Sequence, residues 1–189
     1  LINWSEIMIS NKVSDIKLLQ SMPNNFGSFK SIQEVFAYCY FDNLDVDSKF
    51  KKNIENEGDK FYRYNFFYAN YLIEKNRKKE AASIHESSAK KYPRNLLINQ
   101  LRENLEKNNK SKNKFSCQNP EDILAEIFYA FANALSVQKR FELSNLYINF
   151  SKYLNSNFKS YDALLAENLL KLGKKIDSKK IFLKLFEIG

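Results

Sequence analysis

Small and apolar residues recur along this chain of 189 residues with one internal spacing. A small residue is followed three positions later by Leu and, nine positions after that, by a second small residue. The copies are Ala69, Leu72 and Ala81, then Ala132, Leu135 and Ser144, then Ala166, Leu169 and Ser178. The last copy begins 34 positions after the second. This spacing puts small residues on two successive helices, as close antiparallel packing requires, and its period indicates a helical solenoid.

Apolar periodicity elsewhere predicts further helices joined by short turns. Only four Gly and three Pro interrupt the chain, which favours a mostly helical protein. Asn76 and Gly173 fall where a helix end needs a positive φ, and Pro93 stops the helix before it. The expected helices cover about 1–9, 13–21, 28–41, 44–55, 60–75, 78–91, 95–107, 121–137, 141–154, 159–172 and 175–187.

Residues 108–120 differ from their surroundings, because they open with a polar, Lys- and Asn-rich run that has no periodicity. Ala132 comes 63 positions after Ala69, which is not a multiple of the period, so the loop interrupts the array. Asn119 can cap the next helix and Pro120 can occupy its first position.

We therefore expect N-terminal helical repeats over 1–107 and C-terminal repeats over 121–189. A helix begins at the first residue, so we expect the first repeat to be truncated. The chain does not begin with Met and has no apolar leader, so we expect an internal fragment or a mature form.

The net charge of +8 raises the question of nucleic-acid binding. Lys residues are spread over the whole chain, whereas nucleic-acid binders concentrate charge on one stripe, so solvated faces are the favoured interpretation. No run of about 18 apolar residues is present, so we expect no membrane span.

The side chains that carry chemistry are few. Cys39 lies in an apolar helical run and is expected to be a buried small hydrophobe, while Cys117 lies in a loop and could be more exposed. A disulfide between them is the less favoured alternative. His85 has no second imidazole at metal-binding spacing, and no phosphate loop or nucleophile motif is present. We expect no catalytic residue, cofactor or metal.

The pattern of Ala-x-x-Leu, a small residue nine positions later and Pro93 twelve after Ala81 resembles the tetratricopeptide repeat (TPR). The resemblance is best over 62–95, 125–158 and 159–189 and weaker over 1–60.

A narrower resemblance is carried by the run Ala-Glu-Ile-Phe-Tyr at 125–129 and by Tyr153-Leu154. These residues resemble an alphaproteobacterial TPR family of unknown biochemical role, whose members commonly carry an export signal. A periplasmic location is therefore implied, with a cytoplasmic one as the alternative. His85 and Ser88 depart from the repeat pattern, which has a larger aromatic residue and an Ala there.

The repeat resemblance implies an all-α, right-handed superhelical solenoid of antiparallel helix pairs, with roughly five to six repeats, one of them irregular. It also implies a concave groove, lined by the first helix of each pair, that binds a peptide or protein. The positions that map to this groove are Arg63, Phe66, Asn70, Glu126, Tyr129, Asn133, Ala163 and Glu167. In an alternative interpretation, the Asn side chains merely bridge neighbouring helices.

A non-enzymatic interaction scaffold is thus the leading hypothesis for function. One alternative is the repeat region of a larger enzyme, such as a glycosyltransferase, with catalysis elsewhere in a longer chain. Another is an RNA-binding helical array, whose affinity would have to fall steeply with salt.

Overall fold

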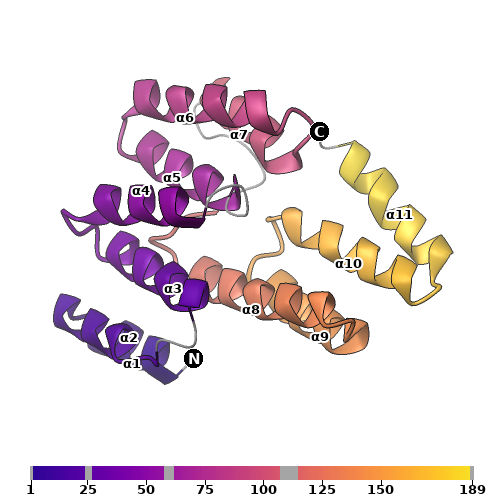
Figure 1. Ribbon diagram of the computed structural model, residues 1–189, viewed down its shortest axis with the longest axis horizontal. Helices are drawn as coiled ribbons and strands as arrows, with labels where there is room; N and C mark the ends of the chain where they lie inside the picture. Colours follow the sequence, from indigo (N-terminus) through magenta and orange to yellow (C-terminus); the bar gives the residue numbers. More distant parts are fainter. Residues whose placement is uncertain (1, 24–26, 58–61, 107–114, 188–189) are drawn as a thin grey trace.

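The computed structural model describes residues 2–23, 27–57, 62–106 and 115–187, and every regular element in these ranges is a helix (Figure 1). The helices are α1 Ile2–Ser10, the 3-10 helix η1 Val13–Ile16, α2 Lys17–Gln20, α3 Gly27–Tyr40, α4 Val46–Glu57, α5 Tyr62–Glu74, α6 Lys78–Lys91, α7 Leu96–Glu106, α8 Pro120–Val137, α9 Phe141–Leu154, α10 Ser160–Lys171 and α11 Lys175–Phe186. The predicted all-α class is confirmed. The helix expected over 13–21 differs, because its first turn is 3-10.

The turns that join paired helices share one backbone conformation. Asp42, Asn76, Lys139 and Gly173 have φ values of 49°, 60°, 60° and 78°. In each turn this residue donates its amide to the carbonyl three positions back, and the next residue donates to the carbonyl five positions back. These are the two hydrogen bonds of a helix C-cap closed by a left-handed residue. The hairpins α3–α4, α5–α6, α8–α9 and α10–α11 therefore end their first helix in the same way.

The positions of these four residues repeat the spacing of the small-residue pattern. Asn76 follows Asp42 by one period of 34 positions, and Gly173 follows Lys139 by the same period. The step from Asn76 to Lys139 equals the step from Ala69 to Ala132. The same turn geometry consequently extends to α3 and α4, where the sequence pattern is weaker. A positive φ at Asn76 and Gly173 confirms the prediction for those two turns.

The small residues of the pattern lie where the paired helices touch. Ala69, Ala81, Ala132 and Ala166 have no exposed surface. In the two C-terminal hairpins a buried serine hydroxyl donates to the carbonyl of the paired alanine, Ser144 to Ala132 at 2.7 Å and Ser178 to Ala166 at 2.8 Å. Each buried hydroxyl is therefore satisfied without opening the helix pair.

The start of α8 is fixed locally, as predicted. Pro120 is the first residue of the helix, and the side-chain oxygen of Asn119 accepts the amide of Glu121 at 3.1 Å. A proline has no amide to lose at this position, so the cap costs no intrahelical bond.

Helices α3 to α6 form a stack on the left of Figure 1, and α10 and α11 extend to the right. Helix α7 packs against α5 and α6, whereas α8 packs against α3, α9 and α10. The segment that contains the predicted loop therefore carries the chain from α7 back to the middle of the molecule. Residues 108–114 of that loop lie outside the described residues.

The end of the predicted loop is part of the hydrophobic core. The ring centre of Phe115 lies 4.1 Å from that of Phe67 on α5 and 5.7 Å from that of Phe36 on α3. It lies 5.8 Å from the ring centre of Phe158, just before α10. Phe115 is only 4% exposed. Residues 115–119 are not helical, but Phe115 and Cys117 are buried, so this end of the predicted loop is not polar. The segments on either side of the loop share one core.

A disulfide between Cys39 and Cys117 ties α3 to the segment that precedes α8, with the two Cα atoms 5.7 Å apart. Both residues are buried. The expectation of two separate cysteines with Cys117 the more exposed is therefore wrong. A cross-link that closes a long loop restricts the unfolded chain strongly.

Two exchanges at equivalent turn positions test the repeated geometry. Gly173→Ala is expected to lower the free energy of unfolding by about 1 kcal/mol, because a Cβ strains the left-handed backbone although nothing lies within 4 Å of it. Lys139→Gly is expected to raise it by about 0.5 kcal/mol, because relief of strain outweighs the added freedom of the unfolded chain. Urea unfolding followed by circular dichroism measures both.

Gln138→Gly is the matched control, since Gln138 has a φ of −79°. Glycine gains nothing there and should destabilise. A loss of stability in Lys139→Gly equal to that in Gln138→Gly would contradict the shared turn geometry.

Candidate functional site

Arg63, near the start of α5, is the centre of a polar cluster that joins three helices. Its Nε and Nη2 donate to the two carboxylate oxygens of Glu126 on α8, at 2.5 and 2.7 Å. Its Nη1 donates to the hydroxyl of Ser160 at the start of α10. Arg63 is 9% exposed and Glu126 is 1% exposed. A two-pronged ion pair of this kind fixes both distance and orientation.

Aromatic rings enclose the guanidinium group. Its central carbon lies 4.0 Å from the ring centre of Tyr129 and between 5.2 and 5.5 Å from those of Phe67, Phe158 and Tyr161. A cation over an aromatic face is attracted by the ring, more strongly where water is excluded. The guanidinium of Arg63 therefore holds the ring of Tyr129 in place through one of its faces.

The ionisation of these groups suits a structural ion pair. Burial by itself would lower the pKa of Arg63, but the carboxylate of Glu126 outweighs burial and raises that pKa above its ordinary value. Burial raises the pKa of Glu126, and the positive charge of Arg63 opposes that rise. Burial also raises the pKa of Tyr129 to about 12. Arg63 therefore stays charged and Tyr129 stays protonated at neutral pH.

Half of the predicted groove residues lie inside the molecule. Arg63, Phe66, Asn70 and Glu126 are buried and do not line an open groove, so this part of the prediction is corrected. The physical reason is that Arg63 and Glu126 bury each other in their ion pair and that Phe158 stacks on Phe66. The side chain of Asn70 accepts from Asn104 on α7 at 2.7 Å, so it bridges two helices. The alternative interpretation of the Asn side chains holds for this residue.

The other four predicted residues reach the surface of two neighbouring helices. Tyr129 and Asn133 lie on α8, and Ala163 and Glu167 occupy the equivalent positions of α10, one repeat period later. Asn133 and Glu167 are exposed, and Tyr129 and Ala163 are half-buried. We call these four residues the α8–α10 surface.

A cavity of about 360 Å³ between α4, α5 and α6 is a feature that the sequence reasoning missed. Tyr68 and Leu72 of α5 form its buried floor, and Ile54 of α4 and Ile84 of α6 lie on its two sides. Polar and charged residues complete the lining: Lys51, Glu55, Asn65, Glu80, Ser83 and Ser87.

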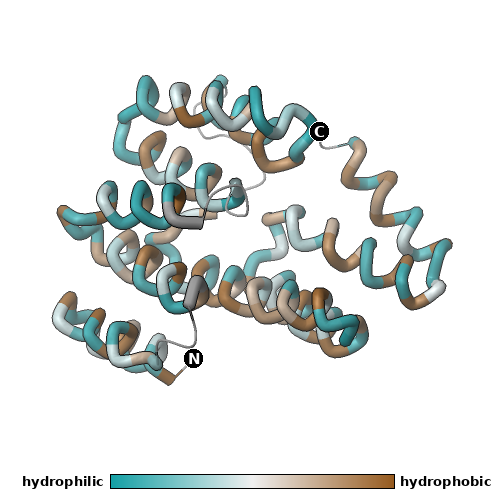
Figure 2. The backbone as a smooth tube through the Cα atoms, viewed as in Figure 1, coloured by the Kyte–Doolittle hydropathy of each residue, from teal (hydrophilic) through white to brown (hydrophobic). Residues whose placement is uncertain are grey.

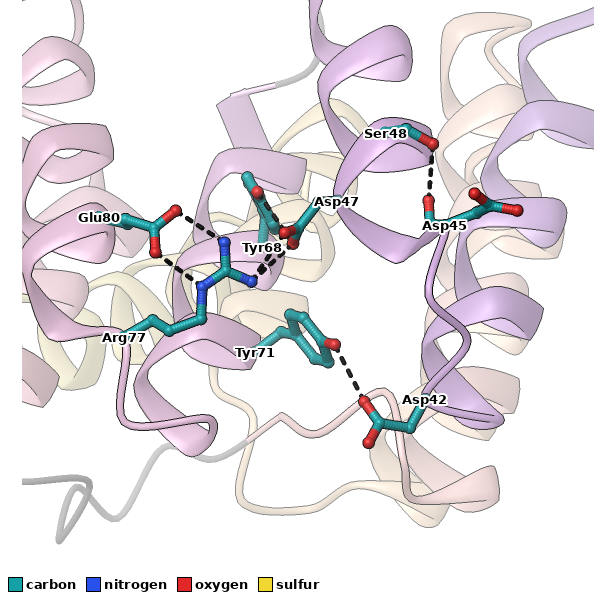
Figure 3. Close-up of polar contacts among 8 residues, drawn as sticks. All are labelled: Asp42, Asp45, Asp47, Ser48, Tyr68, Tyr71, Arg77 and Glu80. Atoms are coloured by element: carbon teal, nitrogen blue, oxygen red, sulfur yellow. Dashed lines mark hydrogen bonds and ion pairs between the residues drawn. The ribbon is translucent and has the colours of Figure 1, made fainter.

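Polar contacts brace one end of this cavity (Figure 3). The guanidinium of Arg77 binds Asp47 at 2.8 Å and Glu80 at 2.7 Å, and the hydroxyl of Tyr68 donates to Asp47 at 3.1 Å. Arg77 immediately precedes α6, and its spacing of three from Glu80 could have indicated their pairing, because side chains three apart are neighbours at the start of a helix. No local pattern indicates the contact with Asp47, which lies 30 residues away.

No protein-family model matches the chain, and no curated protein or solved structure matches it either. Within the described ranges, no helix is both long and apolar enough to cross a bilayer. Over the same residues, no group of three or more His, Cys, Asp or Glu side chains is placed to hold a metal ion.

A double-mutant cycle tests the coupling of α5 and α8. Arg63→Met is expected to lower the free energy of unfolding by about 3–5 kcal/mol, because the buried carboxylate of Glu126 loses its partner. The double variant Arg63→Met, Glu126→Leu is expected to recover most of that loss, since no unpaired charge is left. Urea unfolding of the two single variants and the double variant gives the coupling energy.

Arg77→Met is the control, because the pair of Arg77 and Glu80 is partly exposed and should contribute about 1 kcal/mol or less. Strictly additive losses in the Arg63 and Glu126 variants would show that the two side chains are not coupled.

Proposed function

We propose that the chain is a TPR-like right-handed solenoid that acts as a non-enzymatic scaffold and binds a peptide or protein on its concave face. The observation that carries this proposal is the recurrence of one turn geometry at Asp42, Asn76, Lys139 and Gly173. Stacked hairpins of one geometry form an extended, curved surface, and such surfaces serve binding.

The contact of equivalent positions on α5, α8 and α10 supports a continuous stack of first helices. Arg63, Glu126 and Ser160 occupy equivalent places, because the steps between them equal those between the turn residues Asn76, Lys139 and Gly173. All three meet in one cluster. In this proposal the stack passes from α5 directly to α8, and α7 belongs to the one irregular unit.

The α8–α10 surface offers the chemistry that an extended peptide requires. The amide of Asn133 can both donate to and accept from peptide backbone groups, and the carboxylate of Glu167 can accept from amides or pair with a basic side chain. Tyr129 supplies an apolar ring that Arg63 already holds in place. A side chain fixed before binding loses little freedom on binding.

The disulfide between Cys39 and Cys117 supports an exported, periplasmic protein. Structural disulfides form and persist in oxidising compartments and are rare in the cytosol. A partner on the α8–α10 surface would then also be a protein or peptide of that compartment.

Selection from a random peptide library displayed on phage tests the proposed surface. The variant Asn133→Arg, Glu167→Arg is expected to lose the peptides selected on the original chain, with affinities at least about ten-fold weaker, because large cations replace the neutral and acidic groups. Fluorescence anisotropy of labelled peptides measures the affinities, and circular dichroism checks that the helices are kept.

The matched control is Ser83→Arg, Ser87→Arg, which places the same two side chains at the cavity between α4 and α6. Retained affinity in this control is the expected result. Selected peptides that lose affinity in the control and keep it in the α8–α10 variant would overturn the proposed binding face.

A further inference from the structure

The outer side of α10 and α11 carries a second apolar recess of about 240 Å³. Figure 2 shows hydrophobic residues along both helices. Leu170, Phe182, Leu183 and Phe186 line the recess and are 48%, 37%, 56% and 88% exposed. Lys175, Ser178 and Lys179 complete the lining. We call these seven residues the terminal seat.

The terminal seat has an occupied counterpart inside the molecule. Its residues lie one repeat period after Ser136, Phe141, Ser144, Asn145, Ile148, Asn149 and Lys152 of α8 and α9. Helix α10 packs against those two helices. The side chain of Asn168 on α10 bonds Ser136 at 2.6 Å, Ser144 at 2.8 Å and Asn145 at 2.9 Å. Asp162 at the start of α10 pairs with Lys152.

The two places have the same backbone frame. The buried serine of each hairpin donates to the alanine carbonyl of its paired helix, at 2.7 Å for Ser144 and 2.8 Å for Ser178. The turns at Lys139 and Gly173 are also alike. Because α10 fits the first frame, an α-helix of similar width fits the second.

The side chains of the two places differ, and the differences define the helix that the terminal seat selects. Lys179 is the equivalent of Asn145, which contacts Asn168 of α10. Because Lys179 is positively charged, the bound helix should carry a carboxylate where α10 carries the amide of Asn168. Leu170 replaces Ser136 at the same point. Phe186 is the equivalent of Lys152, which pairs with Asp162 near the start of α10. The bound helix should therefore carry an apolar side chain where α10 carries Asp162.

We propose that the terminal seat binds an amphipathic α-helix of a partner protein, with a carboxylate opposite Lys179 and a large apolar side chain opposite Phe186. A second copy of α11 is disfavoured as the occupant, because α11 carries four Lys and one Asp and would bring net positive charge to Lys175 and Lys179. The terminal seat uses Leu170 of α10 together with α11, so it has no residue in common with the α8–α10 surface. Charge complementarity and the occupied seat on α8 and α9 are the grounds for this choice of occupant.

A helix-stabilised, fluorescent peptide with the sequence of residues 159–172 is the probe, carrying Asn168→Glu and Asp162→Leu. It is expected to bind the chain with a Kd of about tens of micromolar and at least about ten-fold more tightly than the unchanged 159–172 peptide. The Lys179→Glu chain should bind the altered peptide about ten-fold more weakly. A peptide that carries Asn168→Lys in place of Asn168→Glu should restore the affinity for this Lys179→Glu chain. Fluorescence anisotropy gives each Kd.

A reciprocal variant keeps the test independent of lost folding. Lys179→Asn with Phe186→Lys copies the residues of the occupied seat, so this chain should prefer the unchanged 159–172 peptide. Lys51→Glu, an equal charge change on α4, should leave all affinities unaltered. Circular dichroism and thermal unfolding check that each variant keeps its helices.

Equal binding of the altered and unchanged peptides, or no binding of either at 200 micromolar peptide (about the upper end of such an assay), would overturn the proposal. If the chain binds vesicles that contain anionic lipid through α11 and binds neither peptide, the helix-binding proposal is overturned and α11 is a membrane-binding surface instead. Loss of phage-selected peptides in the Asn133→Arg, Glu167→Arg variant concerns the α8–α10 surface and leaves this result unchanged.

Discussion

The ion pair of Arg63 and Glu126 constrains how three helices lie against one another. Removing a guanidinium and a carboxylate from water costs several kcal/mol for each ion, and this cost is offset only while the two groups keep good geometry. A slide of α8 along α5 by one turn would separate Arg63 from Glu126, and a slide of α10 would take Ser160 out of reach of Arg63. The charges therefore specify the register of α5, α8 and α10, while the surrounding aromatic rings supply the hydrophobic stabilisation.

That register matters because the chain does not reach α8 directly from α6. Helix α7 and the Lys- and Asn-rich stretch intervene, so short turns alone cannot align the two parts. Two further links act at the same junction. Phe115 fills the space between α3 and α5, and the disulfide of Cys39 and Cys117 holds the returning segment on α3. The junction thus combines an ion pair, an aromatic cluster and a covalent bond.

Features that depend on neighbouring residues could be predicted from the sequence. The cap at Asn119, the left-handed turns at Asn76 and Gly173 and the buried alanines each follow from a local pattern. Features that depend on the path of the chain could not. Spacing predicts a groove position for Arg63, but Glu126 of α8 and Ser160 of α10 contact its side chain and it is buried. Glu126 is 63 residues away, and no local pattern indicates the pairing.

The same limit applies to the candidate site. Asn133 and Glu167 are exposed at the positions that the periodicity predicts. Asn70 occupies the equivalent place on α5, yet α7 covers it. Positions with equivalent spacing therefore lie on the same side of their helices but differ in exposure. Whether such a position meets solvent depends here on α7, which packs on α5.

The central claim is that α5, α8 and α10 form one cooperative stack across the interruption. Native-state hydrogen exchange at increasing urea measures this most directly, because it gives an opening free energy for each helix. We predict that the slowest amides of the three helices merge into one opening reaction with a common free energy and a common dependence on urea. An opening of α8 to α11 at distinctly lower free energy, with α5 still protected, would contradict the claim.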